Sequence, residues 1–307
     1  MAKRFLIAST VDWNTLSPAE QAVYEDHYET LALFLTAIDG TSDTVPYYVT
    51  WFGISESISS SLSVNVDLNG NNIEFDGEDK LSYSDNVATD AIVVNNVGGG
   101  ECIFKNSAIT FDVLKGNGNA FVLNLSLDTV VVHHFFLEGN DNNASLLYHS
   151  SDGISRAFRN IIKNTRRGFS CNDAQGLLEL ENNTIIAAEE KGVARFSGTV
   201  NIYKNYFDGV PGVSGISADD GSNFTSDDTA PTVANRNVSL VDAFVNAAGG
   251  DYTPNPVLAV SGPLQVTGNS GSSPFAAGAL NFPSDGSNLI RSSIIQGKSK
   301  KIAMELL

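Results

Sequence analysis

Cysteine, basic residues and long apolar runs are all scarce in this chain of 307 residues. The two cysteines, Cys102 and Cys171, lie far apart in the sequence, which favours two buried thiols over a disulfide framework. The longest apolar runs fall far short of the ~20 residues that a membrane-spanning helix needs. The apolar stretch near the start is shorter than the ~7 to 15 residues of a signal-peptide core. We therefore expect no membrane segment and no signal peptide, with synthesis in a cytoplasm.

Positive charge is scarce as well, with 18 lysine and arginine residues against 35 acidic residues and a net charge of −17. A body of this charge repels phosphate backbones, which argues against a nucleic-acid partner. The exception is the segment 289–307, where four basic residues outnumber Glu305: Arg291, Lys298, Lys300 and Lys301. We interpret this segment as a basic tail that docks on an acidic surface, or as a C-terminal cap packed on the chain's own fold.

An internal repeat is the most informative feature that is present. Five positions recur at intervals of 27, 27, 23 and 22 residues, and each has an apolar residue three positions before it and two positions after it. Intervals of this length are typical of a supersecondary unit that stacks on its own copies. The five positions are Asn106, His133, Asn160, Asn183 and Asn205.

The spacing around the repeated position predicts a corner in the backbone. The two apolar columns are five residues apart, and an uninterrupted strand would place them on opposite faces. Asparagine tolerates the left-handed conformation that a tight corner requires, and its amide can bond to the same amide one layer away. Each unit is therefore predicted to be a strand, an Asn corner and a second strand. Units of this kind, stacked in parallel, form an all-β solenoid held by a ladder of corner side chains.

Three segments, FRNII (158–162), LENNTII (180–186) and IYKNYFDG (202–209), resemble rungs of the right-handed parallel β-helix, or pectin-lyase-like, superfamily. The motifs LVDAFVN, GDY and SPFAAGA between residues 240 and 279 are similar to the closing segment of many members. In this chain Ala243 stands where that pattern has proline. The resemblance implies a right-handed parallel β-helix. It decides little about function, because this fold hosts lyases, hydrolases, adhesins and inert virion parts.

The chain is divided into three predicted parts, residues 1–44, 45–288 and 289–307. The β-helix occupies the second part, and the first holds a strand and an amphipathic capping helix. Ser17 and Glu20 match a capping box, and apolar residues recur at helical spacing from there to Ile38. A solenoid has an open end whose core must be covered, which an amphipathic helix can do. The alternative is a helix that docks on a partner.

Candidate catalytic residues are few. Hydrolysis of a sugar requires two carboxyl groups about 5 to 10 Å apart, which acids at equivalent positions of adjacent rungs supply. From five positions before the corner to six after it, the aligned rungs offer only the pair Glu101 and Asp128. Asp219 and Asp220 are further candidates, in a stretch rich in glycine and serine that is predicted to be a loop. An enzyme built on these residues would be a polysaccharide lyase or a glycoside hydrolase.

No metal or cofactor site is expected. His133 and His134 are neighbours on a predicted strand, and no acid or cysteine cluster accompanies them at ligand spacing. Arg166 and Arg167 have the chemistry to hold an acidic sugar, but the aligned rungs offer them no stacked basic partner. Together with the short set of paired acids, this favours a chain that is not an enzyme.

The start of the chain, MAKRFLIAS followed by Trp13, resembles the starts of short β-helix proteins among the structural genes of tailed phages. This resemblance implies a non-enzymatic virion protein, a capsid decoration or spike protein on the particle surface. Its partners would be other virion proteins, and it would be made in the host cytoplasm. The alternatives are a tailspike-like protein that degrades polysaccharide and a protein that binds host surface glycans through exposed aromatic residues such as Tyr203 and Tyr206.

Overall fold

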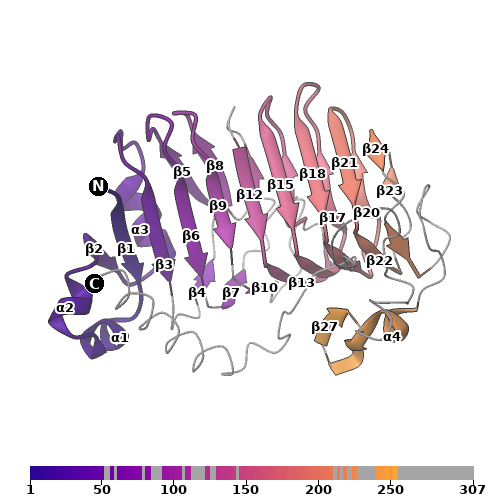
Figure 1. The fold of residues 1–307 in the computed structure, drawn as a ribbon, viewed down its shortest axis with the longest axis horizontal. Helices are drawn as coiled ribbons and strands as arrows, with labels where there is room; N and C mark the ends of the chain where they lie inside the picture. Colours follow the sequence, from indigo (N-terminus) through magenta and orange to yellow (C-terminus); the bar gives the residue numbers. More distant parts are fainter. Residues whose placement is uncertain are drawn as a thin grey trace, which may run out of the picture.

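The architecture is a stack of parallel strands, shown in Figure 1 as a computed structural model. The structure describes residues 1–51, 56–58, 61–77, 80–83, 92–105, 108–111, 122–124, 129–142, 145–209, 213–214, 217–219, 223–226, 239–249 and 251–254.

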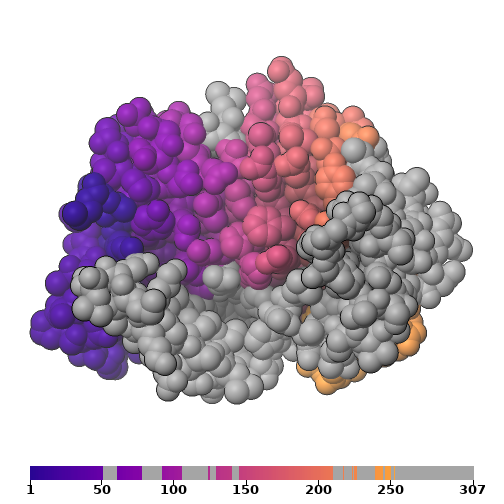
Figure 2. All heavy atoms as spheres, viewed as in Figure 1, coloured from indigo at the N-terminus to yellow at the C-terminus, as the bar shows by residue number. Residues whose placement is uncertain are grey.

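Three parallel sheets run along the molecule, and the chain visits sheet 1, sheet 2 and sheet 3 in the same order on every turn. Within the described residues, sheet 1 has ten strands, sheet 2 has eight and sheet 3 has seven. The chain is therefore an all-β parallel solenoid of about six turns, as the repeat predicts. In the space-filling view the turns follow one another in sequence order, from the N-terminal end at the left to the last described turns at the right (Figure 2).

Neighbouring strands within each sheet come from successive turns of the chain. Sheet 1 consists, in spatial order, of β2 (Asp26–Tyr28), β1 (Lys3–Ile7), β3 (Tyr47–Trp51), β6 (Ile73–Gly77), β9 (Cys102–Lys105), β12 (Thr129–His133), β15 (Ile154–Phe158), β18 (Leu177–Glu181), β21 (Thr199–Tyr203) and β24 (Ala218–Asp219). Sheet 2 consists of β25 (Phe224–Thr225), β22 (Tyr206–Asp208), β19 (Thr184–Ile186), β16 (Ile161–Thr165), β13 (Phe136–Asn142), β10 (Ala108–Phe111), β7 (Lys80–Tyr83) and β4 (Glu56–Ile58). Sheet 3 consists of β23 (Val213–Ser214), β20 (Lys191–Arg195), β17 (Arg167–Cys171), β14 (Leu147–His149), β11 (Val122–Asn124), β8 (Ile92–Asn96) and β5 (Leu62–Val66).

Inward-pointing side chains at equivalent positions stack into apolar columns. In sheet 1 the rings of Phe75 and Phe104 stack with centroids 4.6 Å apart and planes 3° apart. The same column continues through Val132, Ala157 and Leu180, all fully buried. Because each turn buries its apolar side chains only against the turns beside it, the core is a continuous column rather than a closed cluster.

The register corrects the first two units of the aligned repeat. That alignment places Ile103 and Val130 in the column of Ala157, whereas the structure places Phe104 and Val132 there. Both strands contain unbroken apolar runs, with apolar residues on the outward face as well. The alternation of apolar and polar residues therefore does not show which side chains point inward. The alignment is consequently wrong by one residue in the first unit and by two in the second.

The N-terminal segment contains short elements rather than one long helix. It holds α1 (Thr10–Thr15), α2 (Pro18–Gln21) and α3 (Leu31–Ile38), with β2 between the last two. The capping box forms, since the Ser17 N–H donates to Glu20 over 2.8 Å and the Ser17 hydroxyl accepts from the Glu20 N–H. The predicted continuation to Ile38 is wrong because residues 26–28 pair with β1 as a strand and Thr30 caps a new helix.

Helix α3 covers the open end of the core. Its buried residues recur at helical spacing, and the Phe34 ring packs edge-on against Phe75 with centroids 6.0 Å apart. Phe34 also contacts Phe5 of β1, at 5.3 Å between centroids. The expected amphipathic cap is therefore this shorter helix. Strand β1, from the same N-terminal segment, pairs with β3 along its whole length and so belongs to sheet 1.

The segment that resembles a β-helix closing motif covers the side of the solenoid. It forms α4 (Leu240–Ala243), β26 (Phe244–Asn246), η1 (Ala247–Gly249) and β27 (Asp251–Pro254), with β26 and β27 antiparallel. Phe244 and Tyr252 pack on outward-facing residues of sheet 2, among them Tyr206, whose ring lies 5.0 Å from that of Phe244. Tyr206 is fully buried, so the expectation of an exposed Tyr206 is wrong.

The described part of the chain bears on the two cysteines and on membrane-spanning helices. Cys102 and Cys171 are both free and buried, as expected. Within the ranges that the structure describes, no helix has the length and apolar character to cross a membrane.

Candidate functional site

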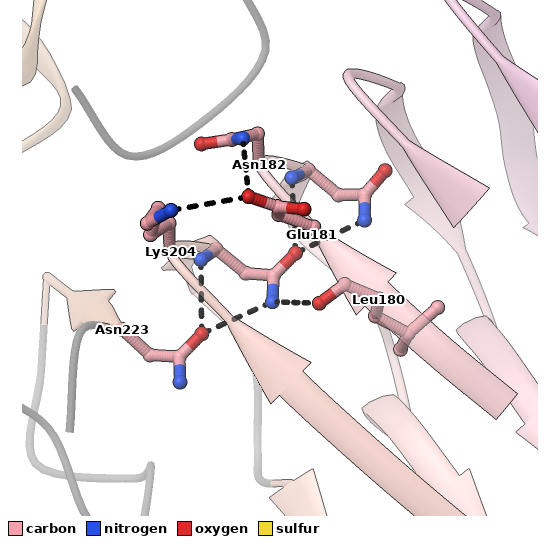
Figure 3. A network of polar contacts seen from close by, with 7 residues as sticks. Leu180, Glu181, Asn182, Lys204 and Asn223 are labelled. Carbon is pink, nitrogen blue, oxygen red and sulfur yellow. Dashed lines mark hydrogen bonds and ion pairs between the residues drawn. The ribbon is translucent and has the colours of Figure 1, made fainter. Parts of the chain in front are cut away.

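A ladder of buried asparagine side chains follows the corner between sheet 1 and sheet 2. Nδ2 of Asn160 donates to Oδ1 of Asn183 over 2.9 Å. Nδ2 of Asn183 donates to Asn205, and Nδ2 of Asn205 donates to Asn223, over 3.0 Å in each case. All four side chains are at most 1% exposed. Figure 3 shows the end of this ladder at Asn223.

Each ladder amide also binds the backbone of neighbouring turns. Nδ2 of Asn183 donates to the carbonyl of Ala157 over 2.8 Å, and Nδ2 of Asn205 donates to that of Leu180 over 3.0 Å. The backbone N–H groups of Asn160 and Asn183 donate to the next Asn Oδ1, over 3.1 and 2.9 Å. One carboxamide such as that of Asn183 therefore links three successive turns, with its donors and its acceptor used within the fold.

The residue before each ladder position makes the corner. Positive φ values of 54°, 57°, 55° and 53° occur at four equivalent positions, which are His134, Arg159, Asn182 and Lys204. The prediction that the ladder asparagine itself adopts the left-handed conformation is therefore wrong. Turning the chain one residue earlier directs the asparagine side chain into the solenoid, where its amide meets the next one.

His133 is not part of the ladder. Phe135 occupies the equivalent position, and its N–H donates to Oδ1 of Asn160 over 3.0 Å. His133 lies two residues earlier, at the end of β12, where it pairs in register with Phe158. Because phenylalanine has no side-chain amide, the series of hydrogen bonds between side-chain amides starts at Asn160.

The ladder has one further member that the sequence comparison missed. Asn223 is the last ladder member within the described residues and lies only 18 residues after Asn205, in the stretch that the sequence predicts to be a loop. The interval is shorter than the others and the stretch is rich in glycine and serine, so the repeat pattern in the sequence does not reveal this turn. Asn106, the first predicted member, lies outside the described residues.

The histidine pair is a surface cluster packed on an aromatic ring. The His133 ring stacks on Phe158, with centroids 4.6 Å apart and planes 7° apart, and its Nδ1 lies 2.7 Å from Nδ1 of His134. Burial, and next the charges of His134 and Lys105, lower the pKa of His133 to about 4. Burial likewise lowers the pKa of His134. Within the described ranges no three metal-binding side chains converge, here or elsewhere.

Ion pairs between neighbouring turns line the outer face of sheet 1. Lys105 pairs with Glu74 at 2.6 Å and with Asp76 at 3.4 Å. Farther along the sheet, Lys204 pairs with Glu181 at 3.1 Å, as Figure 3 shows. Each of these pairs joins side chains from adjacent turns, so the charges of the outer face connect turns to one another.

Glu101, a candidate catalytic residue, belongs to the same outer face. Its Oε1 lies 3.8 Å from Arg156, which also pairs with Glu179 at 2.8 Å. Its backbone N–H donates to Oδ1 of Asn72 on the preceding turn over 2.9 Å. Its proposed partner Asp128 lies outside the described residues, as does Asp220. Asp219 is described only in its backbone, at the end of β24 beside Ile202.

The basic tail predicted at residues 289–307 also lies outside the described residues. Its four basic residues therefore have no described position: Arg291, Lys298, Lys300 and Lys301.

Two carboxyl groups meet on turns that connect sheet 3 to sheet 1, a pair that the sequence comparison missed. Asp152 follows β14 and Asp173 follows β17, and the two carboxyl groups are close enough for each to shift the pKa of the other. The hydrogen bond with Asp173 raises the pKa of Asp152. The N–H of Gln175 lowers the pKa of Asp173. The two acids precede Asn160 and Asn183 by eight and ten residues, so a comparison at equal offsets within five residues of the corner could not pair them.

A buried polar network of Asn124, His149 and Ser155 lies near this carboxyl pair. Nδ1 of His149 lies 2.7 Å from the hydroxyl of Ser155, and Asn124 donates to that hydroxyl over 3.0 Å. Burial lowers the pKa of His149. Since Asn124 also donates to Nδ1 over 3.3 Å, the ring's own proton is placed on Nε2. A neutral imidazole held in this way is a structural part of the core.

Arg166 and Arg167 converge on one carboxylate. Nη2 of Arg167 donates to both oxygens of Glu190 at 2.9 Å, and Nε of Arg166 donates to the same group. The Arg167 guanidinium also lies over the Phe196 ring, 4.8 Å from its centroid. Burial would raise the pKa of Glu190, but the bonds from Arg167 and Arg166 lower it.

The environment of Arg167 corrects one expectation. Lys191 lies beside Arg167 in register, so a stacked basic partner does exist. Glu190 is held by two arginines. The cluster thus joins two turns through a shared carboxylate, in the same manner as the ion pairs of sheet 1.

Comparison of the chain with protein-family models, with curated proteins and with solved structures gives no match. The fold therefore stands on the parallel register and the ladder, and the resemblances to β-helix families rest on their sequence motifs alone.

Proposed function

We propose that this protein is a non-enzymatic structural component of a phage virion, a capsid decoration or spike protein on the particle surface. One observation carries the proposal: polar side chains of successive turns are bonded to one another. The Asn160–Asn223 ladder does this inside, and the Lys105 and Arg156 ion pairs do it outside. Side chains engaged in this way hold turns in register, which is the property that a stiff surface element requires.

The dimensions of the solenoid suit such a role. The ten strands of sheet 1, spaced ~4.8 Å apart, correspond to a rod of roughly 43 Å. A buried amide that loses its partner costs about 1 to 3 kcal/mol, so bending or sliding one turn against the next would break several costly bonds at once. The acidic composition, with a net charge of −17, suits an outer surface rather than contact with packaged nucleic acid.

The virion assignment itself is tested by locating the protein. Purified particles are analysed by mass spectrometry, and the copy number per particle is measured. The proposal expects the protein in stoichiometric amount on intact particles, with density of a short rod on the surface. Absence from purified particles, or accumulation as a free secreted protein, would contradict it.

A second candidate is a tailspike-like β-helix protein that degrades or binds polysaccharide. The observation that favours it is the carboxyl pair of Asp152 and Asp173, whose pKa values are shifted in opposite directions. Opposed shifts of two adjacent acids are a known arrangement for acid–base chemistry. Incubation with host capsular polysaccharide, followed by assay for reducing ends or unsaturated sugars, tests this candidate. Activity that disappears in Asp152→Asn would replace the structural proposal.

A further inference from the structure

The N-terminal cap region, defined as residues 8–45, is an acidic surface without a lysine or arginine of its own. It contains seven acids and no lysine or arginine, the acids being Asp12, Glu20, Glu25, Asp26, Glu29, Asp39 and Asp43. Asp43 pairs with Lys3 of β1 at 2.6 Å. Within the described ranges, the exposed acids Glu25, Asp26 and Glu29 make no ion pair with lysine or arginine within 4 Å, although the charge of Lys3 acts on Glu25 from a greater distance.

Hydrogen bonds inside the cap hold these acids in place without neutralising them. The Thr10 hydroxyl donates to Glu29, which brings the start of α1 beside the turn before α3. The His27 N–H, on β2, which is the edge strand of sheet 1 within the described residues, donates to the Asp26 carboxylate over 2.8 Å. His27 is fixed below by stacking on Trp13, at 4.8 Å between ring centroids. The negative charge is therefore carried by an ordered surface.

Exposed apolar side chains lie among these acids. Leu33, on the outward face of α3, is 54% exposed, and Val11 of α1 is 73% exposed. Leu33, in the first turn of α3, follows Glu29 by four residues, and Val11 follows the Thr10 that bonds to Glu29. The outward face of the cap thus combines negative charge with apolar area, and its matching ligand is a segment with both positive charge and apolar residues.

The segment 289–307 has this complementary composition. Its four basic residues against Glu305 give a net charge of +3. Apolar residues alternate with them: Ile294, Ile295, Ile302, Met304, Leu306 and Leu307.

The chain is long enough for this segment to reach the cap of its own molecule. Arg291 follows Pro254, the end of β27, by 37 residues. At ~3.3 Å per residue that length spans at most roughly 120 Å. The solenoid is roughly 43 Å long. Because the segment is covalently attached, binding to the cap of the same molecule is favoured over binding to that of a second one.

From these observations we infer that the basic segment 289–307 docks on the acidic outward face of the N-terminal cap of its own chain. The docked segment neutralises Glu25, Asp26 and Glu29 and covers Leu33 and Val11. It links the two ends of the solenoid. This inference is independent of the virion assignment, because it concerns a contact within one chain.

A zero-length carbodiimide cross-linker tests the contact in the full-length protein, because it joins a lysine amine to a carboxylate only when they touch. An equimolar mixture of unlabelled and ¹⁵N-labelled protein is cross-linked, and the monomer and dimer fractions are digested and analysed by mass spectrometry. We expect Lys298, Lys300 or Lys301 joined to Glu25, Asp26 or Glu29, in peptide pairs of a single isotope. Pairs of mixed isotope would show a contact between two copies and would overturn the inference, as would tail lysines joined mainly to acids outside the cap.

A matched pair of variants makes the test specific. Glu25→Gln with Asp26→Asn and Glu29→Gln removes three cap charges and retains groups that accept hydrogen bonds. Glu138→Gln with Glu189→Gln and Asp208→Asn removes three charges from the side of the solenoid. The cap variant lacks the carboxylates that the cross-linker needs, so cross-linking cannot report on docking in this variant. Docking is instead measured by the rate of amide hydrogen exchange in β2. We expect exchange about tenfold faster in the cap variant and in Lys298→Gln with Lys300→Gln and Lys301→Gln, and unchanged in the side variant. Equal exchange in the tail variant and the native protein would overturn the inference even if the cap variant fails to fold.

Discussion

Removal of one rung of the asparagine ladder should destabilise the solenoid more than its size suggests. In Asn183→Ala four hydrogen bonds disappear, two from Asn160, one to Ala157 and one to Asn205. The Asn160 N–H and the Ala157 carbonyl are then left buried without these partners. At about 1 to 3 kcal/mol for each unsatisfied buried group, the free energy of unfolding should fall by about 3 to 5 kcal/mol.

That loss is large against the ~5 to 15 kcal/mol by which a folded domain is usually stable. Urea unfolding followed by circular dichroism measures it, provided that native and variant proteins show the same dependence on denaturant. The matched control is Asn201→Ala, on the outward side of β21, where the side chain is only partly buried and should contribute within about 0.5 kcal/mol. If the two substitutions cost the same, the ladder is not a source of stability and the reasoning fails.

Three further predictions concern the charged groups. The raised pKa of Asp152 means that its interaction with Asp173 stabilises the fold at acid pH, and this stabilisation is lost as the pH rises through that pKa. The thermal midpoint should therefore fall over this pH range. Asp152→Asn should abolish the fall, and an unchanged pH profile in the variant would contradict the prediction. His133 has a pKa lowered to about 4, so stability should be full above its unfolded value of about 6.5 and should fall as the pH drops toward 4; His133→Gln should flatten that part of the urea-midpoint profile. Arg167→Ala should cost about 2 to 4 kcal/mol in urea unfolding because Arg167 is buried against Glu190 and Phe196, whereas Arg156→Ala, in an exposed pair, should cost less than about 1 kcal/mol; equal costs would contradict the distinction.

The repeat predicts the fold class because its last three units, around Asn160, Asn183 and Asn205, each have clear apolar columns on both sides of the corner. Period and burial agree there, so the parallel stack and its amide ladder can be predicted from sequence. The second unit fails because three consecutive valines, Val130 to Val132, give no phase, and His133 then takes a place that belongs to Phe135. Apolar residues on an outward face carry the same sequence signal as core residues.

The candidate site could be predicted only in part, because its contacts depend on turn lengths. Asp152 and Asp173 meet although they stand at different offsets in their units, since the turn after β17 is longer than the turn after β14. Likewise, Lys191 lies beside Arg167 in sheet 3, which the alignment around the corner does not reach. Register within the sheets, rather than distance from the corner, decides which side chains meet.

The stacking of the ladder amides can be observed directly by nuclear Overhauser spectroscopy on protein labelled with ¹⁵N in asparagine alone. The account predicts cross-peaks from the backbone N–H of Asn160 to the side-chain amide of Asn183, from Asn183 to Asn205 and from Asn205 to Asn223, with none that skip a turn. Assignment follows from the loss of single signals in the individual alanine variants. Side-chain amides that show no contact with one another, or that contact amides two turns away, would contradict the register on which the fold and the proposed role depend.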